Sequence, residues 1–192
     1  SLTGLPTRGY FAELAAERLQ QDPSNRLAAL VIFNVDGFKH VNDMQGHVVG
    51  DKLLAAISER LSASAQGKGL VGRLVGDEFV VRVAAQDEEI IQDLVKAMHE
   101  EVQGIYKIDC LDLRVLLNGG VVVAEADGFD MEAWQIKADL ALHDAKAVGN
   151  GRLITFRPEM DARYVAEQNL KADLRRAIEN GDLTVVYQPM YR

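Results

Sequence analysis

Residues 70–84 read LVGRLVGDEFVVRVA, and this stretch decides the fold. Two runs rich in β-branched residues flank the pair Gly76 and Asp77. A glycine at the first of two central positions is typical of the primed turns, whose twist matches that of the flanking strands. The pattern therefore predicts a β-hairpin.

The tip of this hairpin carries two adjacent carboxylates, Asp77 and Glu78. Paired carboxylates on a rigid tip can hold a hard divalent cation such as magnesium. Asp and Gly are also common turn residues, and the hairpin taken alone favours an ordinary solvated turn. The choice between a metal site and a plain turn depends on the rest of the chain.

The composition is that of an ordinary soluble globular protein, with 48% apolar and 26% charged residues in a chain of 192. A net charge of −8 without a run of Lys and Arg argues against nucleic acid as a partner. The single cysteine, Cys110, excludes an internal disulfide and a cysteine-based zinc cluster, and it is consistent with a reducing compartment. No stretch approaches the roughly 18 to 20 apolar residues of a membrane-spanning helix. We therefore expect a cytoplasmic location without direct membrane insertion, although a parent protein could carry an anchor elsewhere.

The uninterrupted apolar run at 27–33 is typical of a central strand that is buried on both faces. Polar residues follow it abruptly, and alternation places Asn34 and Asp36 on one side with Val35 on the other. The carboxyl ends of buried strands are where open α/β sheets usually bind ligands. An alternative is that Asp36 and Asn42 only cap the following turn and helix.

Hydrophobic periodicity places helices and further strands on both sides of the hairpin. Helices are expected at about 8–20, after Asp51, at 87–103 with Ile90 on its buried side, and at 131–147. Strands are expected at 111–117 and 121–124, joined through a flexible Asn118-Gly119-Gly120, and at 152–156. This order predicts an α+β fold in which helices flank a central mixed or antiparallel sheet with a βαββαβ core.

The composition changes after Pro158, where a long charged segment at 159–180 favours a helix and Gly181 ends it. Residues 183–187 then read as a strand. We interpret residues 1–158 as one domain, and residues 159–192 as a linker helix with the truncated start of a second domain.

With these segments placed, the chain resembles GGDEF domains, the diguanylate cyclase family that condenses two GTP into cyclic di-GMP. The motifs that carry the resemblance are LTGLPTR at 2–8, DGFK at 36–39 with Asn42 and Asp43, Gly46-His47, Gly50-Asp51, Arg73 with GDEF at 76–79, and ADLAL at 138–142 with Ala145-Lys146. The resemblance implies a nucleotide-cyclase-like core with an added hairpin. Residues 170–189 resemble the opening of an EAL phosphodiesterase domain, which implies a fragment of a tandem GGDEF-EAL protein.

The resemblance also assigns residues to the nucleotide. Asn42 and Asp51 would hydrogen-bond guanine, Lys39 and Lys146 would meet the phosphates as point charges, and Gly76 would lie in the turn beside them. Each domain of the family holds one GTP, and two domains must face each other for attack of a 3′-hydroxyl on the partner's α-phosphate. A homodimer is therefore implied.

By the same resemblance, Asp77 would hold magnesium and assist deprotonation of the hydroxyl, with Glu78 beside it. The backbone of Val35 would be a further ligand. The family's first metal-binding aspartate is Asn34 here, and an amide oxygen brings no negative charge. Magnesium binding is therefore expected to be weakened or lost.

Other departures fall near the same site. The first glycine of the signature is Val75, and Asn150 stands where the family usually supplies an arginine to the phosphates. The R-x-x-D of the inhibitory product site is Gln66-Gly67-Lys68-Gly69, so feedback binding is not expected. These changes predict a degenerate, inactive cyclase that binds GTP and regulates an adjacent EAL domain in cyclic di-GMP signalling. Two alternatives stay open, namely an active cyclase of reduced rate and a dimerisation or interaction scaffold that binds no nucleotide.

Overall fold

The computed structural model describes residues 2–21 and 25–182. The chain divides into two compact units, Ser1–Phe156 and Arg157–Arg192. In the second unit the described part is helix α6, Glu159–Asn180, which ends at Gly181 in the left-handed conformation with φ 73°. The strand predicted at 183–187 lies outside the described residues.

The first unit is built on a five-stranded sheet with the order β2-β3-β1-β6-β7. The strands are β1 Leu27–Val35, β2 Gly69–Arg73, β3 Glu78–Ala85, β6 Leu117–Glu125 and β7 Leu153–Thr155. All neighbours are antiparallel except β6 and β7, which are parallel. A separate hairpin pairs β4 Gly104–Ile108 with β5 Leu111–Val115. The predicted α+β class with a mixed sheet and a βαββαβ core is confirmed.

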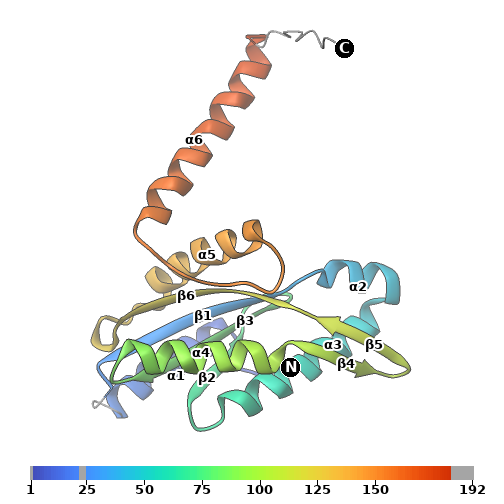
Figure 1. The fold of residues 1–192 in the computed structure, drawn as a ribbon, viewed down its shortest axis with the longest axis vertical. Coiled ribbons are helices and arrows are strands. Elements are labelled where there is room, and N and C mark those ends of the chain that lie inside the picture. The colour runs from blue at the N-terminus through green and yellow to red at the C-terminus, as the bar shows by residue number, and fades with distance from the viewer. Residues whose placement is uncertain (1, 22–24, 183–192) are drawn as a thin grey trace, which may run out of the picture. The chain divides into compact units, whose positions relative to one another are not determined.

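Helices cover both faces of the sheet (Figure 1). They are α1 Arg8–Gln21, α2 Phe38–Gln45, α3 His47–Ala65, α4 Glu88–Val102 and α5 Met131–Val148. Because side chains alternate along a strand, β1 sends Val31 and Phe33 into the core with α3 and α4. Its other side chains, such as Leu30 and Ile32, pack with α1 and α5. The expected central strand, buried on both faces, is confirmed.

The interpretation of Asn118-Gly119-Gly120 as a flexible joint is wrong, since all three residues lie inside β6. A Cβ at Gly119 would approach Phe33 to 2.9 Å, and a Cβ at Gly120 would collide with the backbone of α5 at Ala138 and Leu142. The two glycines are therefore required by close packing and not by a turn. No strand was expected at β4, α2 was expected only as a helix of unstated length after Asp36, and Ile90 is exposed instead of buried.

Candidate functional site

The hairpin of β2 and β3 forms as predicted, and its tip is a tight turn. Glu78 N–H donates to the Val75 carbonyl at 3.1 Å, with Gly76 at φ 61° as the first central residue. Leu74 N–H donates to the Glu78 carbonyl at 2.9 Å, so Leu74 and Val75 both stand opposite Glu78. The extra residue, Val75, forms a one-residue bulge, and its side chain is 76% exposed.

Arg73 holds this tip from within the hairpin. Its guanidinium donates two hydrogen bonds to the Gly76 carbonyl, from Nε at 2.9 Å and from Nη2 at 2.6 Å. Such a two-pronged contact fixes both the position and the orientation of the acceptor. The carboxylates next to Gly76 therefore stand on a braced loop.

The carboxyl end of β1 lies against the same tip. Val35 N–H donates to the backbone carbonyl of Asp77 at 3.3 Å. The side-chain amide of Asn34 donates from Nδ2 to Asp77 Oδ2 at 2.9 Å. Val35 itself is buried in the core with α3 and α4, so Asn34 and Val35 point to opposite faces as expected. The structure thus brings together Asn34, Val35, Asp77 and Glu78, the four residues that the resemblance placed around a metal.

Helix α5 adds further charges to the tip. Burial raises the pKa of Asp77. This rise is opposed by a backbone hydrogen bond at Asp77, by the Lys146 ammonium, by the Asn34 amide and by Arg73. Burial raises the pKa of Glu78 as well, and the nearby Asp139 raises it further.

Burial also raises the pKa of Asp139. A hydrogen bond from Gln135 and the positive charges of Lys146 and Arg8 lower this pKa in part. Lys146 thus stabilises the ionised form of all three carboxyls, Asp77, Glu78 and Asp139. Sequence reasoning quoted Asp139 and Arg73 within motifs but gave them no role. The spacing of Asp139 and Lys146, seven residues or about two turns apart on one helix, was the signal that could have linked them.

The residues expected to contact guanine lie on α2 and α3. Asn42 is half-buried on α2, and Asp51 is exposed on α3. Gly50 is on the side of α3 that packs against α2, and a Cβ at this position would collide with Asn42 Oδ1. This Oδ1 is buried and has no hydrogen-bond partner among residues 2–21 and 25–182. Lys39 is exposed on α2, and Lys146 is exposed on α5. No hydrogen bond or ion pair between described residues joins the α2–α3 group to the hairpin tip.

The donor set at the tip does not fit a carboxylate-rich magnesium site. Two carboxylates, Asp77 and Glu78, are present, and Asn34 turns its NH₂ group toward one of them. Hard cations prefer anionic oxygen ligands, and an amide N–H is a donor that cannot bind a cation. In the described part of the chain no group of three or more His, Cys, Asp or Glu side chains is placed to hold a metal.

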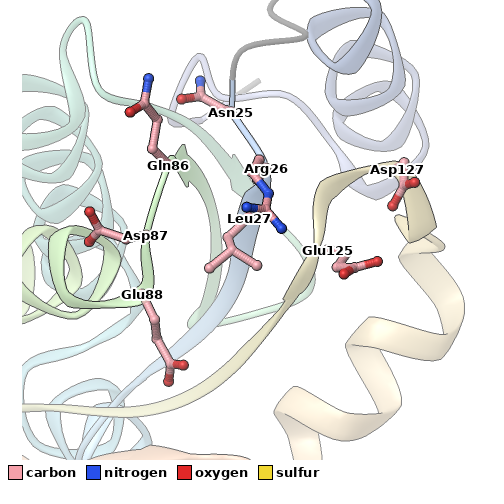
Figure 2. A pocket seen from close by; sticks show the side chains of 8 residues that line it. All are labelled: Asn25, Arg26, Leu27, Gln86, Asp87, Glu88, Glu125 and Asp127. Carbon is pink, nitrogen blue, oxygen red and sulfur yellow. The ribbon is translucent and has the colours of Figure 1, made fainter.

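A separate hollow of about 550 Å³ lies at the other end of the sheet, where Leu27 pairs with Ala85 and Glu125. Figure 2 shows its lining side chains, which are Asn25, Arg26, Leu27, Gln86, Asp87, Glu88, Glu125 and Asp127. Four carboxylates surround it with one guanidinium. Such a lining repels a triphosphate, so this hollow is not the candidate nucleotide site in spite of its size.

Comparisons with known proteins show which family the chain is similar to. The family model described as "Diguanylate cyclase, GGDEF domain" matches residues 1–152. The bifunctional diguanylate cyclase/cyclic di-GMP phosphodiesterase MucR of Pseudomonas aeruginosa is 32% identical over 190 residues, which cover 98% of this chain and 28% of that protein. The cyclic di-GMP phosphodiesterase PdeR of Escherichia coli (strain K12) is 29% identical over 189 residues, with the same two shares, 98% and 28%.

Solved structures share the fold. The crystal structure of the diguanylate cyclase SiaD from Pseudomonas aeruginosa, in complex with its activator SiaC, aligns with a TM-score of 0.70 at 28% identity. The alignment covers 80% of this chain and 60% of that one.

The chain spans about a quarter of the length of the curated relatives named above. None of the helices in the described ranges has both the length and the hydropathy that crossing a lipid bilayer requires. The family model matches well over half of the sequence, and a solved diguanylate cyclase structure shares the fold. The chain therefore belongs to the GGDEF domain family of diguanylate cyclases.

Proposed function

We propose that this domain takes part in cyclic di-GMP signalling as a GTP-binding regulatory module that has lost cyclase activity. The observation that carries the proposal is the hydrogen bond from Asn34 Nδ2 to Asp77 Oδ2 at 2.9 Å. The matching family model is that of the diguanylate cyclase GGDEF domain. The relative MucR is named as both a diguanylate cyclase and a cyclic di-GMP phosphodiesterase, and PdeR is named as a cyclic di-GMP phosphodiesterase. Both facts support the signalling context.

The loss of cyclase activity rests on charge. In-line transfer of a phosphoryl group depends on positioning and on cations that neutralise the developing charge. Here Asn34 supplies no negative charge to hold such a cation, and it occupies one oxygen of Asp77 as a donor. Magnesium is thus held weakly or not at all.

Retention of GTP binding rests on a different set of residues. Asn42 Oδ1 is a buried acceptor without a partner in the described residues, and such an atom costs about 1–3 kcal/mol. The edge of a guanine offers N–H donors that would satisfy it after a small rotation of the side chain. Asp51 would accept a second guanine N–H, and Lys39, Lys146 and the backbone at Gly76 would contact the phosphates. Asn150 in place of a phosphate arginine weakens this last contact.

The partner would be an EAL domain that follows in the parent chain. Residues 1–158 would form the GGDEF domain, and residues 159–192 the linker helix and the beginning of the EAL domain. Nucleotide binding alone can regulate such a neighbour if GTP prefers one arrangement of the two domains or of a homodimer. No magnesium-dependent chemistry is needed for this role.

A second candidate is an active cyclase of reduced rate. The retention of Asp77 and Glu78 on a braced tip, with Lys146 acting on both, favours it. In this reading the Asn34 amide rotates and offers its oxygen to the metal.

The test compares the wild type with the repaired variant Asn34→Asp/Val75→Gly and with Asn34→Ala as a matched control. Calorimetric titration with GTP and magnesium measures binding, and chromatographic detection of cyclic di-GMP at high protein concentration measures turnover. We expect GTP binding without product in the wild type, and stronger magnesium-dependent binding in the repaired variant alone. Product from the wild type would establish the second candidate. Absence of GTP binding in all three proteins would refute the nucleotide role and leave the scaffold.

A further inference from the structure

Arg82 on β3 is a buried cation that the proposed function does not use. Its side chain is 5% exposed, and it pairs across the sheet with Leu30 on one side and Leu70 on the other. Both leucines belong to the apolar cluster between the sheet and helices α1 and α5. A residue in this position would ordinarily be apolar, because burial of a charge is unfavourable unless the charge is paired.

Among the residues that the structure describes, the surroundings of Arg82 do not supply that pairing. Its Nε is buried and has no hydrogen-bond partner in the described part of the chain. The guanidinium carbon lies 5.5 Å from the centre of the Phe129 ring, which gives a cation–π contact. Such a contact compensates only in part for the lost hydration of a guanidinium.

The charged group that acts on Arg82 has the same sign. Burial lowers the pKa of Arg82, and the guanidinium of Arg18 on α1 lowers it further. Arg18 is exposed, and its Nη1 donates to the Gly69 carbonyl at 3.1 Å, which fixes the end of that side chain beside β2. Two guanidiniums thus repel each other where no described carboxylate forms an ion pair with either of them. An anion held by the two guanidiniums would remove the repulsion, and a rotation of the Arg82 side chain would bring its buried Nε–H to the same anion.

We propose that Arg82 and Arg18 form a binding site for a phosphate group. A phosphate dianion carries the two negative charges that match the two guanidiniums, and its oxygens suit the fork of donors on each arginine. The exposed Arg18 would receive the anion from solvent, and Arg82 would hydrogen-bond it from the sheet. The source is either free phosphate or the phosphate group of a small metabolite.

This site is separate from the hairpin tip. Arg82 follows Glu78 by four residues on the same strand, which places the two about 13 Å apart along β3. The proposal does not depend on GTP binding at Lys39 and Lys146. Its test therefore uses inorganic phosphate and glycerol phosphate, with no nucleotide present.

The experiment measures the thermal unfolding midpoint of the 192-residue protein during phosphate titration, against sodium chloride at equal ionic strength. The NMR resonance of the Arg82 Nε–H is followed in parallel. We expect the midpoint to rise with phosphate and the resonance to shift and saturate. Arg18→Gln should weaken the apparent affinity roughly tenfold or more, since it removes a charge-assisted hydrogen bond. Arg82→Met should abolish the phosphate effect and raise the midpoint in chloride.

Two control variants separate the alternatives. Arg114→Gln changes an exposed arginine on β5, and Lys146→Gln changes the proposed triphosphate contact; both should retain the full phosphate effect.

Binding of inorganic phosphate alone assigns the free ion as ligand, whereas binding of glycerol phosphate as well assigns a phosphate group. The proposal is overturned if chloride stabilises the protein as much as phosphate does, or if Arg114→Gln weakens binding as much as Arg18→Gln. If Arg82→Met does not fold, the Arg18→Gln titration and the Arg82 resonance decide the question.

Discussion

Gly50 on α3 leaves the space that the side chain of Asn42 on α2 occupies. A Cβ at position 50 would collide with Asn42 Oδ1 and would lie 3.2 Å from the Phe38 ring. The backbone φ of Gly50 is ordinary, so the glycine is required by the neighbouring amide and not by the helix. The position of the proposed guanine-binding amide therefore depends on a missing side chain on the next helix.

Gly50→Ala should displace Asn42 and weaken GTP binding. We expect a loss of stability of about 1–3 kcal/mol from overpacking, partly offset by the better helix propensity of alanine. Calorimetry with GTP and urea unfolding measure the two effects. Gly9→Ala on α1 is the matched control, because a Cβ there meets nothing within 4 Å. A Gly50→Ala protein that binds GTP like the wild type would contradict the assignment of Asn42.

Asn34→Asp should make the stability of the domain depend on magnesium. Without metal, two carboxylates replace an amide–carboxylate hydrogen bond, and we expect a loss of about 1–3 kcal/mol at neutral pH. Magnesium should restore this loss by binding between Asp77 and the new carboxylate. Unfolding midpoints in EDTA and in magnesium measure the effect, with Asn34→Ala as a control that loses the hydrogen bond without gaining a ligand. Equal midpoints in both buffers would count against a metal position at this tip.

The pH dependence of stability should change when Asp139 is replaced. The pKa values of Asp77 and Asp139 lie above the ordinary 3.8 in the folded protein, and that of Glu78 lies above 4.5. A raised folded pKa means that the folded state binds the proton more tightly than the unfolded state. The resulting stabilisation is present below the ordinary pKa and is lost as pH rises through the folded value.

Asp139→Asn removes one of these groups and also relieves Glu78, whose pKa Asp139 raises. The unfolding midpoint of this variant should therefore fall less steeply than that of the wild type as pH rises above about 4. Midpoints across a pH series for the two proteins provide the measurement. Parallel curves would show that Asp139 does not interact with Glu78.

Gly120→Ala should destabilise the sheet strongly. The new Cβ would meet the Ala138 carbonyl and the Leu142 amide, which are backbone atoms of α5 and cannot move alone. We expect a loss of about 1–3 kcal/mol or more in urea unfolding. Gly128→Ala, where nothing lies within 4 Å of the added carbon, should be close to neutral. Similar unfolding curves for both variants would mean that α5 can shift away from β6.

The elements with strong local patterns could be predicted from the sequence. The apolar run of β1, the turn at Gly76 and the inward face of α5 at Trp134, Ala138 and Leu142 all have the expected place. The predicted neighbours Asn34 and Asp77 do meet, because the end of a central strand and the tip of its neighbouring hairpin share one edge.

The errors come from residues whose role depends on distant neighbours. Gly119 and Gly120 look like a joint along the sequence, and only their contact with Phe33 and α5 explains them as strand residues. The interactions of Asp139 and Arg82 likewise depend on tertiary neighbours, Glu78 and Arg18 respectively. Such relationships have no local periodicity and could not be read from the chain.

The two hydrogen bonds from Arg73 to the Gly76 carbonyl affect which substitutions the hairpin tip can accept during evolution. Because Arg73 on β2 holds the Gly76 carbonyl, the turn forms with Val75 in the position where the family usually has a glycine. Catalytic side chains can then be replaced one at a time while the outline of the surface stays constant. A protein that recognises that outline would bind an inactive domain of this fold as well as an active one.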